Sequence, residues 1–149
     1  MRFRIALLAG LLAFAGCSGG PRFAPVTGVV TIDGVPYGKA VVSFQPISDG
    51  KDPNPGKGSS AYTDANGRFV LVGTDGEAGA VVGKHRVRIM TAGNNVVGAS
   101  DTGSDDKADA PNVDPIPQEW NARSTKEFDV PAGGTDKANF DIVSKKKTK

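Results

Sequence analysis

The sequence predicts an all-β protein, and more closely a seven-stranded antiparallel β-sandwich. Its apolar composition is unusual, because after Cys17 the chain contains sixteen valines but a single leucine, Leu71. Valine favours the pleated, half-buried surface of a sheet, whereas helices need periodic runs of Leu, Ala, Glu and Lys. The apolar residues also alternate with polar ones in short runs that Gly, Pro, Asn and Asp separate. This pattern is typical of short strands joined by turns and packed as two sheets.

Arg2 and Arg4 begin a segment that we expect to be a signal peptide of residues 1–16. The apolar run that follows, residues 5–15, is shorter than the about 20 apolar residues that a membrane-spanning helix needs. Small residues then stand directly before Cys17, the only cysteine of the chain. This order resembles a bacterial lipobox, in which the cysteine sulfur receives a diacylglycerol and the signal is cut just before the cysteine.

Cys17 is therefore the predicted lipid-attachment site. A lone cysteine in an exported chain has no partner for an intramolecular disulfide, and acylation gives the thiol a use. The match departs from the usual pattern at Phe14, where leucine is common. The alternatives are an ordinary secretory signal or a buried free cysteine. With Ser18 after the cysteine, the lipobox implies a protein anchored in the cell envelope, at the outer membrane, facing the periplasm or the cell surface.

The mature chain is predicted to hold one domain between a tether and a tail. Residues 17–25 are rich in Gly and Pro and should form a flexible tether, residues 26–143 carry the strand pattern, and residues 144–149 hold four lysines. Removing the two arginines of the signal leaves 16 basic and 16 acidic residues, so the mature chain has no net formal charge. A lysine run without interleaved aromatics is most simply a solvated tail, and we expect no nucleic-acid partner.

The first strands are predicted from period-two alternation and turn residues. Every second residue from Val26 to Ile32 falls on one face, and Asp33-Gly34 then turns the chain. Residues 40–44 alternate in the same way. Three prolines and three glycines make residues 46–58 a loop.

A hairpin is predicted next. Residues 59–63 and 68–72 flank Asn66-Gly67, a pair that tolerates positive φ. Phe69 and Leu71 alternate toward the core. Across the domain, four large side chains on separate strands are expected in the core: Phe44, Phe69, Val87 and Phe140.

The remaining strands are expected over residues 84–91, 126–130 and 138–143, with irregular chain over residues 92–117. Alternation turns three cations of the first of these strands outward: Lys84, Arg86 and Arg88. It turns three anions of the last two outward: Glu127, Asp129 and Asp141. The two groups pair if the strands share a sheet. Otherwise the cations form an exposed basic stripe suited to an acidic polymer.

Taken in this order, the motifs resemble those of the transthyretin-like, carboxypeptidase regulatory-like domain in its stand-alone bacterial lipoprotein form. The matching residues are Gly28, Val30, Asp33, Gly34, Pro36, Ala40, Val42, Phe44, Thr63, Asp64, Gly67, Phe69, Gly83, Val87, Ile116, Pro117, Trp120, Phe140 and Ile142. The resemblance covers residues 26–143 and implies a seven-stranded sandwich without a catalytic role of its own. His85 and Trp120 stand where such domains often carry tyrosine.

No enzymatic activity and no cofactor are expected. In carboxypeptidases this domain accompanies a zinc peptidase domain, and a catalytic zinc site needs about three protein ligands of the His or Glu type, whereas this chain has one histidine. The hydroxyisourate hydrolases of transthyretin fold rely on several His and Arg residues and end in Y-R-G-S, whereas this chain ends in K-K-K-T-K. No serine lies in a G-x-S-x-G elbow, and no glycine-rich phosphate motif occurs.

Three features could hold a ligand, and each has a simpler structural interpretation. His85 is expected to be a partly buried, hydrogen-bonded structural histidine rather than a ligand or a base. Trp120 is expected to pack at the rim of the sandwich, with stacking on carbohydrate as the alternative. An acidic segment could bind Ca²⁺, although its spacing fails the EF-hand pattern and a solvated loop is simpler. Its members are Asp101, Asp105, Asp106, Asp109 and Asp114.

The sequence thus predicts a non-enzymatic, membrane-anchored lipoprotein of the cell envelope that acts as an interaction or structural module. Its expected partners are the membrane, through the lipid on Cys17, and an envelope protein or polysaccharide. The alternative is an extracellular protein that binds carbohydrate or calcium through Trp120 and residues 101–114.

Overall fold

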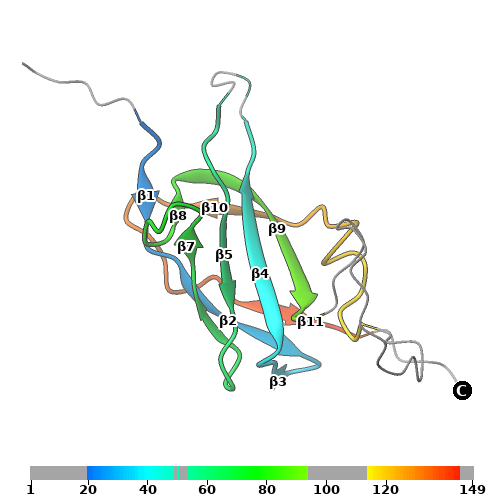
Figure 1. Ribbon diagram of the computed structural model, residues 1–149. Helices are drawn as coiled ribbons and strands as arrows, with labels where there is room; N and C mark the ends of the chain where they lie inside the picture. Colours follow the sequence, from blue (N-terminus) through cyan, green and yellow to red (C-terminus); the bar gives the residue numbers. More distant parts are fainter. Residues whose placement is uncertain (1–19, 49, 51–53, 94–113, 145–149) are drawn as a thin grey trace, which may run out of the picture.

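The computed structural model describes residues 20–48, 50, 54–93 and 114–144 (Figure 1). Within these residues the chain is all-β, as predicted, with eleven strands and no helix. The strands are β1 (Phe23–Ala24), β2 (Thr27–Ile32), β3 (Val35–Pro36), β4 (Ala40–Pro46), β5 (Ser59–Tyr62), β6 (Arg68–Val70), β7 (Val72–Gly73), β8 (Ala80–Val81), β9 (Gly83–Thr91), β10 (Glu127–Val130) and β11 (Phe140–Ile142). Four of these strands, β1, β3, β7 and β8, have only two residues, which accounts for the excess over the seven expected.

Several predicted features lie outside the described residues. They are the signal peptide, Cys17, four of the five aspartates of the acidic segment (Asp101, Asp105, Asp106 and Asp109) and the four lysines of the tail. In the described part of the chain, no helix is long and apolar enough to cross a membrane.

The strands form two larger groups and one small sheet. A five-stranded sheet has the order β10-β9-β4-β5-β7, and all its neighbours are antiparallel. A second group has the order β11-β2-β3, with β6 also paired to β2, while β1 and β8 form a two-stranded sheet. One pair departs from the predicted antiparallel arrangement, because β11 runs parallel to β2. The chain crosses from the first sheet to the second after β10, and β11 therefore runs alongside β2 instead of β10.

The two larger groups share one core, built from alternate residues of their strands. Phe44 of β4 and Val87 of β9 are 1% and 0% exposed, and Phe69 of β6 and Phe140 of β11 are 2% and 9% exposed. The ring of Phe140 lies 6.2 Å from the ring of Phe44 and 6.2 Å from that of Phe69, between centroids. The predicted burial of all four residues is confirmed.

The predicted hairpin is correct at its turn, and its two arms pair in part. The Asp64 carboxylate accepts the backbone N–H groups of Asn66 (2.8 Å) and Arg68 (2.9 Å), and Gly67 has φ 71°. A Cβ at Gly67 would lie 2.4 Å from the Val30 carbonyl oxygen, so this turn requires glycine. Beyond it, Ser60 of β5 pairs with Val72 of β7, as predicted, whereas β6 pairs with β2 and not with β5. Alternation determines the buried face of a strand but not its neighbour.

Both ends of the described chain are tied to the fold. β1 pairs with β8, and Ala24 is 1% exposed. The tether predicted over residues 17–25 is therefore too long, because Phe23 and Ala24 belong to the fold. Ser144, predicted to begin the tail, donates its N–H and its hydroxyl to the Asp33 carboxylate. Figure 1 shows β1 and the end of β11 on opposite sides of the molecule.

Candidate functional site

His85 lies on the inward face of β9 and is 1% exposed. Its Nδ1 is 2.9 Å from the carbonyl oxygen of Gly83, and because a carbonyl only accepts, Nδ1–H is the donor. The ring centroid lies 5.6 Å from that of Phe44, and Nε2 has no hydrogen-bond partner among the described residues. Burial lowers the pKa of His85, while the Gly83 bond and the charge of Asp129 oppose this shift. The expected structural role is confirmed, with a neutral imidazole in the core.

The ring of Trp120 packs against the core on Phe140 and is contacted by Lys126, so it is not a free aromatic surface. Its ring meets that of Phe140 edge to face at 5.9 Å, and the Nζ of Lys126 lies 4.7 Å from the ring centroid. The Trp120 carbonyl also accepts the N–H of Ile89 at 2.7 Å. The predicted packing at the rim is confirmed, and the stacking role loses support because the lysine occupies a face of the ring.

Asp114 is the one aspartate of the acidic segment that the structure describes. Its carboxylate accepts the hydroxyl of Thr91 (2.6 Å) and the N–H of Ile116 (2.9 Å). These bonds give Asp114 a local role in fixing the chain after β9. Within the described ranges, no group of three or more His, Cys, Asp or Glu side chains could hold a metal ion.

The outward cations of β9 lie opposite anions only where β9 pairs with β10, and not where it pairs with β4. Lys84 and Arg86 lie opposite Asp129 and Glu127 of β10, and the Nζ of Lys84 is 3.5 Å from the Glu127 carboxylate. The predicted pairing across one sheet is thus confirmed for β9 and β10. It is wrong for Asp141, because β11 belongs to the second group of strands and the Asp141 carboxylate accepts the hydroxyl of Thr31 at 2.7 Å.

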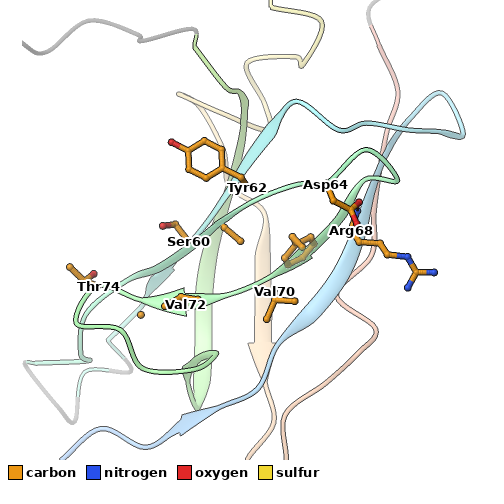
Figure 2. A pocket seen from close by; sticks show the side chains of 10 residues that line it. Ser60, Tyr62, Asp64, Arg68, Val70, Val72 and Thr74 are labelled. Atoms are coloured by element: carbon orange, nitrogen blue, oxygen red, sulfur yellow. Dashed lines mark hydrogen bonds between the residues drawn. The ribbon is translucent and has the colours of Figure 1, made fainter.

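A groove of about 900 Å³ lies over β5, β6 and β7 (Figure 2). Its apolar side chains are Tyr62, Val70 and Val72, which are 74%, 62% and 44% exposed. These exposed fractions are high for apolar side chains that line one groove. In Figure 2 the ring of Tyr62 projects from β5 and lies apart from the two valines, which stand on the other arm of the hairpin.

Polar side chains border the groove at both ends. Ser60 and Thr74 lie near one end, and Asp64 and Arg68 lie at the turn that closes the other (Figure 2). The hydroxyl of Thr74 donates to the Gly58 carbonyl at 2.9 Å, and the backbone bonds described above hold the Asp64 carboxylate. The rim is therefore polar, with one carboxylate and one guanidinium.

The groove forms where two strands separate. The N–H of Thr63 donates to β4 at 2.9 Å, so the adjacent Tyr62 turns its own N–H and C=O away from β4. The N–H of Leu71 donates to the residue before β2 at 3.0 Å, so Val70 turns its peptide groups away from β2. Tyr62 and Val70 therefore direct their backbone polar groups toward each other.

No ladder pair joins these two residues. The pairing of β5 with β7 ends at Ser60 and Val72, and the chain closes again where the N–H of Asp64 donates to the Arg68 carbonyl at 2.8 Å. Between the two closures, the ladder is open at Tyr62 and Val70. The opening lies where the two arms of the hairpin join different groups of strands, β5 with β4 and β6 with β2.

Sequence reasoning missed this site, although part of its signal was present. With Phe69 and Leu71 inward, alternation places Val70 and Val72 outward, next to an outward Tyr62. Three apolar residues on the solvent side of one hairpin are a sign of a binding surface. The opening of the ladder depends on β2, which is distant in sequence, and could not be seen.

Comparison of the chain with protein-family models, with curated proteins and with solved structures gave no match. Function is therefore inferred from the residues and their geometry.

Proposed function

We propose that this protein is a non-enzymatic lipoprotein of the bacterial cell envelope, anchored through Cys17, that displays a β-sandwich of the transthyretin-like, carboxypeptidase regulatory-like type as a binding module. The observation that carries the proposal is the short link between anchor and fold. Only five residues separate Cys17 from Phe23, where β1 begins. Even fully extended, such a link spans roughly 20 Å, so the domain stays next to the membrane.

The sheet arrangement supports the sandwich. A five-stranded sheet and a group of four strands bury a common core of aromatic and branched side chains, as two facing sheets do. Seven of the eleven described strands have three or more residues.

The position of the histidine supports a binding role. His85 is the only histidine of the chain, and its ring is enclosed by the core with Nδ1 bonded to Gly83. A general base must reach the proton it removes, and this ring faces away from solvent. The buried position of this ring therefore supports a binding role for the domain over a histidine-based reaction.

The anchor is tested by Cys17→Ser, with Ser18→Ala as the matched control. We expect Cys17→Ser to lose incorporation of labelled palmitate and to leave the membrane fraction as an uncleaved or soluble form. Ser18→Ala should be acylated and membrane-bound like the wild type. Equal labelling and fractionation of Cys17→Ser and wild type would contradict the proposal.

A further inference from the structure

We infer that the groove over β5, β6 and β7 binds a neutral oligosaccharide segment of an envelope polysaccharide, with the ring of Tyr62 stacked on a sugar ring. The inference rests on the proposed function and names the class of its partner. It also moves the carbohydrate site from Trp120, whose ring packs on Phe140 and Lys126, to a ring that is 74% exposed.

The apolar part of the groove has the shape that a sugar ring needs. Tyr62 supplies a flat aromatic face, and Val70 and Val72 add apolar surface on the other arm of the hairpin (Figure 2). A pyranose ring is amphipathic, with C–H groups on its faces and hydroxyls around its edge. Stacking therefore buries the C–H face on Tyr62 while the hydroxyls point to the rim.

The polar part matches the hydroxyl edge. Ser60 and Thr74 place hydroxyls near one end of the groove, and Asp64 and Arg68 place an acceptor and donors near the other. The open ladder adds the backbone N–H and C=O groups that Tyr62 turns toward β6. Rigid backbone groups of this kind orient a ligand by hydrogen bonds.

The charge of the rim and the volume of the groove indicate the class of ligand that it binds. The rim carries one carboxylate and one guanidinium, so the groove offers no excess charge for a polyanion or a polycation. Its volume of about 900 Å³ falls within the range of small-ligand sites, about 300–1,000 Å³. Three exposed apolar side chains are too few for a specific protein interface, which buries at least about 1,000 Å².

Membrane attachment compensates for a weak single site. Many copies anchored in one membrane face the same polymer, and each further contact forms at high effective concentration. A shallow groove that holds one or two sugar rings is therefore sufficient to retain a polysaccharide at the envelope.

The test is calorimetric titration of the full mature protein in detergent with cellohexaose, maltohexaose and chitohexaose. We expect at least one of these neutral probes to bind, Tyr62→Ala to weaken that binding about tenfold, as loss of an aromatic contact does, and Tyr62→Phe to preserve it. Val70→Ala should weaken binding, whereas Val35→Ala, which trims a valine that is 66% exposed and outside the groove, should not.

Two results would overturn the inference. One is a lack of binding to all three probes, and the other is equal binding by Tyr62→Ala and wild type. Self-association in sedimentation equilibrium that Tyr62→Ala abolishes would likewise reassign the surface to a second copy of the chain. The anchor is tested separately, because Cys17→Ser should keep oligosaccharide binding and Tyr62→Ala should keep membrane attachment.

Discussion

The buried ring of His85 lies beside that of Phe44, and its Nε2 has no hydrogen-bond partner in the described part of the chain. Such a nitrogen is tolerated while it is neutral, because only its lone pair is buried. Protonation would put a charge beside Phe44 in the core, and the Gly83 carbonyl and the charge of Asp129 offset this cost only in part. Burial therefore lowers the pKa of His85 below its ordinary value of 6.5.

The free energy of unfolding should fall as the pH falls below about 6.5. Below that pH the unfolded chain binds a proton on His85 that the folded chain excludes, so the stability is complete above pH 6.5 and is lost as the pH falls toward the lowered pKa of the folded state. Urea unfolding between about pH 7.5 and 5.5 measures this slope. His85→Phe should flatten it, and identical slopes in the variant and the wild type would show that the ring titrates freely.

Phe69 and Val70 are neighbours on β6 with opposite environments, 2% and 62% exposed. Phe69→Ala should lower the free energy of unfolding by about 3–5 kcal/mol, because it removes a buried ring and leaves a cavity beside Phe140. Val70→Ala, one residue away, should change it by less than about 0.5 kcal/mol. Chemical denaturation of the two variants measures both values, and similar losses would mean that the strand is rotated.

The edge between β9 and β10 offers a test of register. Lys84 and Glu127 should couple by about 0.2–1 kcal/mol in a double-mutant cycle, and the coupling should fade with added salt. Arg88 pairs in register with Ser43 of β4 and lies beyond the end of the β9–β10 pairing, so a cycle with Asp129 should give no coupling. The reverse result, coupling of Arg88 but not of Lys84, would require a shifted register.

Much of this strand pattern could be predicted from sequence, because alternation depends on adjacent residues only. The inward faces of β2, β4 and β9 follow from spacings of two, as the burial of Val30, Val42 and Ile89 shows. Strand partners depend on residues far apart. The parallel pairing of β11 with β2, the divergence of β5 and β6 and the docking of β1 on β8 were therefore missed.

The candidate site could likewise be predicted only where it depends on adjacent residues. Alternation alone turns Tyr62 and Val70 outward, but the open ladder between them lies where β6 pairs with β2 and not with β5, which is a long-range arrangement. His85 and Trp120 could be assigned to packing from their surroundings in sequence. The contact that covers the Trp120 ring, the ammonium of Lys126, comes from the following loop and needed the fold.

The whole molecule has a membrane side and a free side under the proposed anchor. β1 follows the anchor closely, and the end of β11 lies on the opposite side of the molecule (Figure 1). Ser144, the last residue that the structure describes, is bonded there to Asp33 in the turn after β2.

Intact-mass spectrometry of the protein from the membrane fraction of a bacterium that processes lipoproteins tests the central claim most directly. We expect a chain that begins at Cys17 and carries the added mass of a diacylglycerol and an N-linked acyl group. Several acyl chains suffice for stable attachment, since each buried methylene contributes about 0.8 kcal/mol. A mature chain that begins at another residue, or one that begins at Cys17 with an unmodified thiol, would rule out the lipid anchor.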